Sequence, residues 1–252
     1  MEYNIFSEMV TGYKNILKKS KSQDYLDFDF FDKGIVFAVS DGHSNDFFKY
    51  SDRGAKIACN IAVGMLKDLA DLDTKDLVNM LEEKKIQMEI QSKWMDLVKL
   101  DFERFHPLVF KTEYIKYSTT LIAVLVTNRF RLYLKIGDGN IIIKDDTEFK
   151  EVLETRKSDT VDSLGRIDSY KNIMYYIDDE INKYKENIII FTDGYEQSFD
   201  NKNELYKSLN DTIYMYNKSV FSREVLKRTY KQRLSKLSKQ KSQDDISIVF
   251  LI

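Results

Sequence analysis

The chain has 252 residues and a formal net charge of −2, with 43% hydrophobic and 32% charged residues. This balance is typical of a globular protein and excludes a disordered or collagen-like chain. Two histidines and one cysteine exclude a disulfide framework, a structural zinc site and any metal site with several His ligands. A bound metal would therefore be held mainly by oxygen atoms.

Charge and hydropathy also limit the partners of the chain. A net charge close to zero gives no general attraction to nucleic acid or to a membrane surface. No apolar stretch approaches the ~20 residues that a membrane-spanning helix needs, and residues 1–10 lack the basic start and apolar run of a signal peptide. Together with the lone Cys59, these features predict a cytoplasmic protein. They do not indicate an oligomeric state.

The strand signals run along most of the chain. With one proline and nine glycines, the chain has neither a linker composition nor an internal repeat, so we expect one domain over residues 1–252. Segments rich in Val, Ile, Phe and Tyr predict strands at 27–31, 34–40, 119–126, 130–136, 140–144, 173–177, 187–192 and 246–252.

Helical periodicity appears in three places. Between the second and third predicted strands, apolar residues fall on one face from Ile57 to Leu72, and again from Leu77 to Phe105. A third helix is predicted at 221–237, with Phe221, Val225, Tyr230, Leu234 and Leu237 as its apolar face. This order is not a regular βαβ alternation, so it predicts an α+β fold in which helices cover antiparallel sheets.

Aspartates stand at the ends of several predicted strands. Three strands run into Asp41-Gly42, Asp138-Gly139 and Asp193-Gly194, while Asp24 and Asp244 lie just before the first and last strands. A strand end holds a carboxylate in place, and a following glycine allows a sharp turn. Several carboxylates in one cleft would raise each other's pKa, and a bound Mg²⁺ or Mn²⁺ would relieve that repulsion. An ordinary turn remains the alternative for each pair.

The same segments, in the same order, resemble the motifs of the metal-dependent Ser/Thr protein phosphatases of type 2C (the PPM family), in a bacterial-like form. The matching segments are Gln23-Asp24, Asp41-Gly42-His43, Ser118-Thr119-Thr120, Gly137-Asp138-Gly139, Thr192-Asp193-Gly194 and Asp244-Asp245-Ile246-Ser247. They span nearly the whole chain. The resemblance implies two packed antiparallel β-sheets flanked by helices, an α-β-β-α sandwich.

The resemblance also implies a centre of two Mn²⁺ or Mg²⁺ ions at one end of the sandwich. By position, Asp41, Asp193 and Asp244 would hold one ion. Asp24, Asp41 and the Gly42 carbonyl would hold the other, so that Asp41 bridges the two. A hydroxide formed between the ions would attack a phosphoserine or phosphothreonine of a protein substrate.

Further roles follow from the same resemblance. His43 is the candidate general acid for the leaving group, with a surface turn histidine as the alternative. Lys19 stands where the family has a phosphate-binding Arg, but lysine cannot grip a phosphate bidentately, and a solvated turn is the alternative. A third ion would use Asp138, Asp193 and Gln197, and Gln197 is a poor ligand.

Other phosphatase classes do not fit the chain. Cysteine-based phosphatases need an Arg six residues after the Cys, and Met65 stands there after Cys59. Calcineurin-like metallophosphoesterases need several His ligands, and beyond His43 only His106 remains. The alternative that stays open is a catalytically silent type 2C-like protein that serves as a binding or scaffold module.

Overall fold

The computed structural model describes residues 3–109, 111–145, 148–154, 161–179 and 186–252. Its strands are β1 (Ile5–Val10), β2 (Tyr25–Phe31), β3 (Gly34–Ser40), β4 (Leu121–Thr127), β5 (Arg131–Ile136), β6 (Asn140–Lys144), β7 (Phe149–Val152), β8 (Met174–Asp178), β9 (Asn187–Phe191) and β10 (Ile246–Leu251). Its α-helices are α1 (Tyr13–Leu17), α2 (Ser51–Asp68), α3 (Thr74–Glu82), α4 (Lys85–Phe105), α5 (Asp193–Glu196), α6 (Lys202–Lys218) and α7 (Val220–Gln240).

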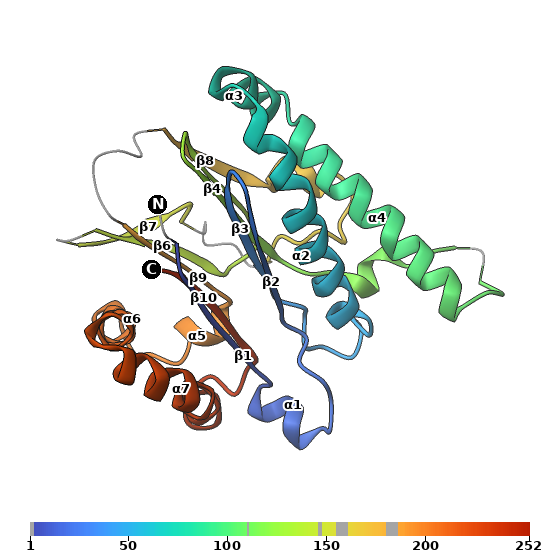
Figure 1. Cartoon of the computed structure of the whole chain (residues 1–252). Coiled ribbons are helices and arrows are strands. Elements are labelled where there is room, and N and C mark those ends of the chain that lie inside the picture. The colour runs from blue at the N-terminus through green and yellow to red at the C-terminus, as the bar shows by residue number, and fades with distance from the viewer. Residues whose placement is uncertain (1–2, 110, 146–147, 155–160, 180–185) are drawn as a thin grey trace.

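The strands form two five-stranded sheets in which all neighbours are antiparallel. One sheet has the order β1-β10-β9-β6-β7 and the other β2-β3-β4-β5-β8. Helices α2, α3 and α4 lie outside the second sheet, and α6 and α7 lie outside the first (Figure 1). The predicted α-β-β-α sandwich is therefore confirmed.

Three apolar layers hold the sandwich together, and β3 shows how one strand serves two of them. Ile35 and Phe37 point into the layer between the two sheets. Val36 and Ala38 point the other way, into the layer beneath α2 and α4. Successive side chains of a strand face opposite sides, so a strand that is covered on both faces reads as a continuous apolar run. This run explains why the sequence signal for β3 is strong.

The elements β1, β7, α1 and α6 were not predicted from the sequence. Strands β1 and β7 carry polar residues at alternate or edge positions, and α1 has only five residues, so their signals are weak. Helix α6 does bury one face, which Leu205, Leu209 and Ile213 form at four-residue intervals. That spacing is a helical signal that could have been found. None of the described helices has the length and apolar character that crossing a membrane requires.

The long helical pattern from Leu77 to Phe105 belongs to two helices. Lys84 adopts a left-handed backbone conformation with φ of 61° between α3 and α4, which ends one helix before the next begins. Each helix then sets its own buried face. Met88 and Phe105, which the pattern placed on a common apolar face, are 41% and 55% exposed.

Helix α7 also differs from its predicted face. Leu226, Tyr230 and Leu234 are buried at four-residue intervals. Phe221 and Val225 lie one residue out of that series, about 100° around the helix, and they are exposed. Apolar character alone therefore misplaced the start of this face.

Candidate metal centre

The aspartates singled out by the sequence stand at one end of the sandwich because neighbouring strands are antiparallel. In the second sheet, Tyr25 at the start of β2 pairs with Ser40 at the end of β3, so Asp24 and Asp41 follow at the same edge. In the first sheet, the register of β9 and β10 brings Asp244 next to the end of β9, where Asp193 begins α5. Because the two sheets pack face to face, the pair Asp24 and Asp41 lies close to the pair Asp193 and Asp244.

A compact carboxylate cluster forms where these strand ends meet. Carboxylate oxygens of Asp41, Asp138 and Asp193 lie within 4.8 Å of one another. They open into a cavity of about 280 Å³. The cavity is lined by Asp41, Gly42, His43, Ser44, Asn45, Phe48, Thr120, Asp138, Asp193 and Asp244. The structure therefore brings four of the five predicted aspartates to one cavity.

Two hydroxyl side chains just before β4 hold the backbone of Asp41. The Asp41 amide donates to Thr120 Oγ1 at 2.9 Å, and the Asp41 carbonyl accepts from the Thr120 amide at 2.9 Å. The same carbonyl accepts from Thr119 Oγ1 at 2.8 Å. Because the backbone is bonded on both sides, the Asp41 side chain is presented to the cavity from a rigid base.

Glycines at the cluster permit close approach of neighbouring backbone. A Cβ at Gly194 would lie 2.0 Å from the Asp245 carbonyl oxygen, and one at Gly42 would lie 2.7 Å from the Gln23 carbonyl oxygen. Any side chain at either position would force the segments before β10 and β2 away from the cluster. The glycines after Asp41 and Asp193 are therefore required by packing as well as by the turn.

Asp24 lies behind the cavity and is only 3% exposed. Its Oδ2 accepts from Thr192 Oγ1 at 2.7 Å, while its Oδ1 is buried and has no hydrogen-bond partner among the described residues. Asp193 Oδ1 is likewise buried and has no hydrogen-bond partner among the described residues. A buried carboxylate oxygen without a donor is costly, by about 1–3 kcal/mol or more for a charged group. These two oxygens are therefore available to a cation.

The electrostatics of the cluster point the same way. Burial, with the charges of Asp24 and Asp193, raises the pKa of Asp41 well above its usual range. Burial, with the charge of Asp245, raises the pKa of Asp24 in the same way. Burial also raises the pKa of Asp193 to about 6. Carboxylate oxygens outnumber the hydrogen-bond donors around them, and such oxygens are the ligands that a hard divalent cation such as Mg²⁺ or Mn²⁺ prefers.

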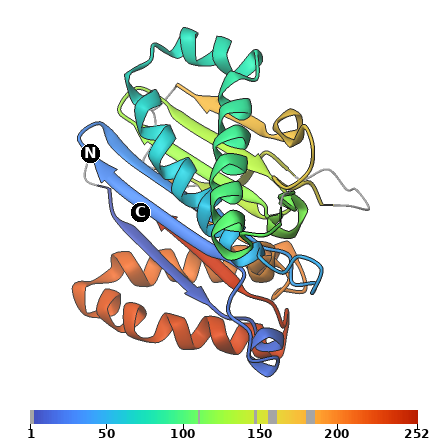
Figure 2. The ribbon, with the colours of Figure 1, turned by 90° about the vertical axis from the view of Figure 1, so that its right-hand side faces the viewer.

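Lys14 is a residue of the cluster that the sequence pattern missed. Its Nζ forms an ion pair with Asp244 Oδ2 at 2.7 Å, and its charge lowers the pKa of Asp193. Lys14 belongs to the short helix α1, which lies beside the segment before β10 (Figure 2). The partners are 230 positions apart and α1 has no clear helical signal, so the sequence offered no means of finding this contact.

Asp245 belongs to one of the sequence motifs, which assigned it no role, and in the structure it supports the site. Its Oδ1 accepts from the Gly12 amide at 2.5 Å. Its Oδ2 accepts from Asn15 Nδ2 at 2.9 Å and from the Gln23 amide at 2.6 Å. The buried carboxylate of Asp245 thus holds the segment from Gly12 to Gln23, which contains α1, against the start of β10. It also fixes the position of Gln23, the residue before Asp24.

His43 reaches the cavity, whereas Lys19 does not. The imidazole of His43 packs against Phe48, with ring centroids 4.5 Å apart. Burial lowers the pKa of His43, and the nearby charge of Asp138 partly opposes that shift. Lys19 is exposed in the turn after α1, where its φ is 56°, and it does not line the acidic cavity.

The residues proposed for a third ion are only partly assembled. Asp138 lies in the carboxylate cluster with Asp193. The Gln197 side-chain amide donates to Asp193 Oδ2 at 2.5 Å, so it uses that oxygen as a hydrogen-bond acceptor. The adjacent Glu196 accepts from Asn140 Nδ2 at 2.6 Å instead. These contacts favour Asp138 over Gln197 as a ligand.

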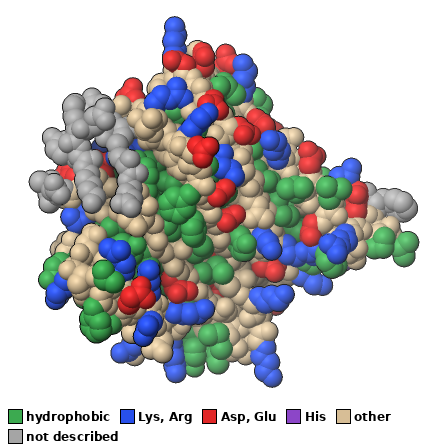
Figure 3. All heavy atoms as spheres, viewed as in Figure 1, with side chains coloured by type: hydrophobic (Ala, Val, Ile, Leu, Met, Phe, Trp, Pro, Cys, Tyr) green, Lys and Arg blue, Asp and Glu red, His purple; other side chains and the backbone are tan. Residues whose placement is uncertain are grey.

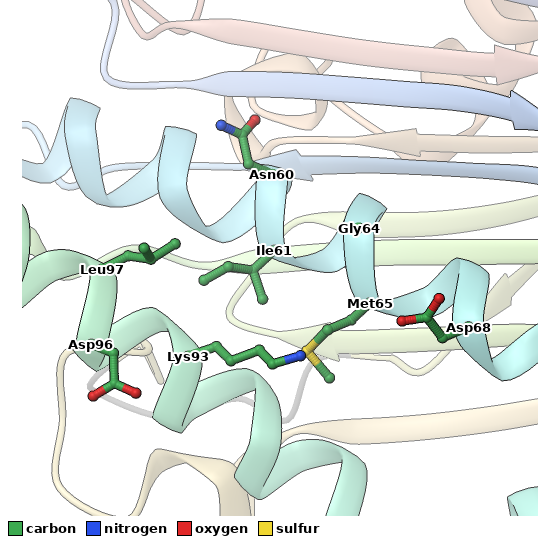
Figure 4. Close-up of a pocket in the computed structure, with 8 residues that line it drawn as sticks. All are labelled: Asn60, Ile61, Gly64, Met65, Asp68, Lys93, Asp96 and Leu97. Atoms are coloured by element: carbon green, nitrogen blue, oxygen red, sulfur yellow. The ribbon is translucent and has the colours of Figure 1, made fainter.

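Another cavity, of about 350 Å³, lies in the outer helical layer between α2 and α4. Asp68, Lys93 and Asp96 stand around its apolar floor of Ile61 and Met65 (Figure 4). It has neither a carboxylate cluster nor a connection to the strand ends. Among the cavities of the described residues, the one at the strand ends therefore has the chemistry of a metal centre.

Comparison with known proteins adds sequence and fold evidence. A family model described as Protein phosphatase 2C matches residues 11–236, which ends before Asp244. No curated protein matches the chain.

Solved structures with the same fold share little sequence with the chain. Serine/threonine phosphatase Stp1 from Staphylococcus aureus is 10% identical, with a TM-score of 0.61 over 100% of this chain and 95% of that chain. The catalytic domain of the serine threonine protein phosphatase PstP, in complex with 2 manganese ions, is 14% identical, with a TM-score of 0.57 over 99% and 97%. RsbX, in complex with magnesium, is 14% identical, with a TM-score of 0.53 over 99% and 94%.

Proposed function

Because the chain belongs to the protein phosphatase 2C family, we propose that it is a metal-dependent phosphatase that hydrolyses phosphoserine or phosphothreonine in protein substrates. The observation that supports this most is the group of buried and half-buried aspartates at the strand ends. The Oδ1 atoms of Asp24 and Asp193 are buried there without a hydrogen-bond partner among the described residues. A scaffold would gain nothing from carboxylates that repel one another.

The proposed ligands follow from the family motifs and from the arrangement of the cluster. Asp41, Asp193 and Asp244 would hold one ion, and Asp24, Asp41 and the Gly42 carbonyl would hold a second. Asp138 is the candidate for a third. When bound, Mn²⁺ or Mg²⁺ supplies Lewis-acid chemistry, lowering the pKa of a water molecule and offsetting phosphate charge.

The residues around the ligands would position the reaction. Thr119 and Thr120 hold the Asp41 backbone, and Thr192 holds one oxygen of Asp24. Lys14 forms an ion pair with Asp244, so its positive charge would offset part of the negative charge at that ligand. His43 is proposed to donate a proton to the departing serine or threonine oxygen.

Hydrolysis of p-nitrophenyl phosphate tests the proposed function. After removal of bound metal with a chelator, we expect turnover to return only when Mn²⁺ or Mg²⁺ is added. The melting temperature should rise with the same concentrations of ion, because binding to the folded state stabilises it. An ion-dependent melting temperature without turnover would identify a silent binding module. Loss of both responses would reject the metal centre.

His43→Gln is expected to separate two kinds of substrate. A serine alkoxide needs a proton in order to leave, whereas p-nitrophenolate is a stable anion. We therefore expect kcat for a phosphopeptide to fall about 10²-fold, with little change for p-nitrophenyl phosphate. His106→Gln is the matched control, since His106 contacts Tyr50 at the end of α4. Equal losses on both substrates would contradict the acid role.

A further inference from the structure

A second, larger cavity adjoins the carboxylate cluster. It has a volume of about 580 Å³ and lies between the turn after α1, the loop after His43 and the start of α2. Ser44 and Asn45 line both cavities, so the two are separated only by this short stretch of chain. A peptide whose phosphorylated residue occupies the acidic cavity can therefore reach the larger one with a neighbouring residue.

The charge of the larger cavity is opposite to that of the cluster. Four cationic side chains line it, namely Lys18, Lys21, Lys49 and Arg53, against two acids, Asp46 and Asp52. Arg53 is already ion-paired with Asp101. The three lysines form no ion pair with a described residue, and Lys49 lies 5.6 Å from the centre of the Tyr50 ring, so no carboxylate neutralises their charges. Lys and Arg side chains also stand out at the lower edge of Figure 3, where Figure 1 places α1 and the end of α7.

Two further features of the wall suit an anionic peptide. Helix α2 begins there with Tyr50 as its N-cap, and no side chain caps its first turn. The positive end of an 18-residue helix therefore adds to the field of the lysines. The Gln23 amide group donates to Ser51 Oγ at 3.2 Å, while Gln23 Oε1 is buried without a partner among the described residues. Because Gln23 lines the cavity, a rotation of its side chain would let that oxygen accept a peptide N–H.

We propose that this basic cavity binds an anionic side chain of the substrate, next to the phosphoserine or phosphothreonine that enters the acidic cavity. The inference rests on the proposed phosphatase function. The anion would be a carboxylate of Asp or Glu or a second phosphate, since both are recognised by the same lysines. The chain would then prefer phosphopeptides with acidic neighbours to those with neutral ones.

A series of fluorescently labelled phosphoserine peptides tests this. Each peptide carries one Glu, or one additional phosphoserine, at a successive position before or after the target, in an otherwise neutral sequence. We expect the best anionic position to lower KM about two- to fivefold against the all-neutral peptide, with kcat unchanged. The preference should vanish at 0.5 M NaCl, because salt screens exposed charges. A larger effect from phosphoserine than from Glu would identify doubly phosphorylated substrates.

The variant Lys18→Ala/Lys49→Ala should lose the preference while its turnover of p-nitrophenyl phosphate stays unchanged, because that small substrate does not reach the cavity. Lys207→Ala, an exposed lysine on α6, is the matched control. A wild-type protein without any preference, or a double variant that keeps it, would overturn the inference. If no substrate is hydrolysed, the proposed function fails separately. Fluorescence anisotropy of the same peptides, with the same variants, then decides the binding inference.

Discussion

Asp41→Asn is expected to lower Mn²⁺-dependent hydrolysis by about 10³-fold, the equivalent of about 4 kcal/mol of transition-state stabilisation. Asp41 is the proposed bridging ligand, and its carboxylate lies within 4.8 Å of those of Asp138 and Asp193. An amide offers one neutral oxygen, so it would weaken both proposed ion sites. Calorimetric titration with Mn²⁺ should show the loss of affinity directly, independently of turnover.

The same substitution should stabilise the metal-free protein. Burial and neighbouring charges raise the pKa of Asp41 well above its usual range, so folding opposes the charged form. Asn removes that penalty, and we expect a gain of roughly 1–2 kcal/mol in the free energy of unfolding. Urea denaturation in the presence of a chelator measures it. Asp211→Asn, at an exposed position on α6, should change neither stability nor activity.

The pH dependence of the metal-free protein has the same origin. The pKa of Asp193 is raised to about 6 from 3.8, so between these values the folded state holds more protons than the unfolded state. Stability should therefore fall as pH rises from about 4 to above 6, by roughly 1–3 kcal/mol. Saturating Mn²⁺ should abolish the fall. If the stability of the metal-free protein rose over this pH range, the raised pKa of Asp193 would be wrong. If Asp41→Asn were less stable than the wild type without metal, the raised pKa of Asp41 would be wrong.

Asp245→Ala is expected to destabilise the fold by roughly 3–5 kcal/mol, which is the usual consequence of removing one partner from a buried charged network. Asp245 is 3% exposed and accepts from the Gly12 amide, the Asn15 side chain and the Gln23 amide. Without it, three donors lose their partner, and the α1 segment is released from β10. Thermal and urea denaturation of the metal-free protein provide the measurement.

Asp244→Ala is the neighbouring control for Asp245→Ala. Asp244 is partly exposed and its ion pair with Lys14 is at the surface of the cluster, so in metal-free protein its removal should change stability by less than about 1 kcal/mol. Its effect should instead appear in Mn²⁺ affinity. If the two alanine variants were equally stable, Asp245 would not be the anchor of the α1 segment.

The strand-end aspartates could be found from the sequence because their signal is local. A buried strand such as Ile35–Val39 reads as a continuous apolar run, and the Asp-Gly pair that follows marks its end. Three such endings, with Asp24 and Asp244 before other strands, were enough to predict one carboxylate cluster. The buried faces of helices were less secure, because a single left-handed residue, Lys84, divides one apparent pattern into two helices.

The sequence alone reveals the alternation of apolar strands and helices, the aspartates at strand ends and their family motifs, since each depends on residues that are neighbours in the chain. The contacts that join those strand ends become visible only in the folded chain. Lys14 contacts Asp244, and Asp245 contacts Gly12 and Gln23, which links segments up to 233 residues apart. The lysines of the second cavity likewise come from separate segments of the chain. Such contacts arise from the packing of two sheets and a short helix, and no local pattern of residues encodes them.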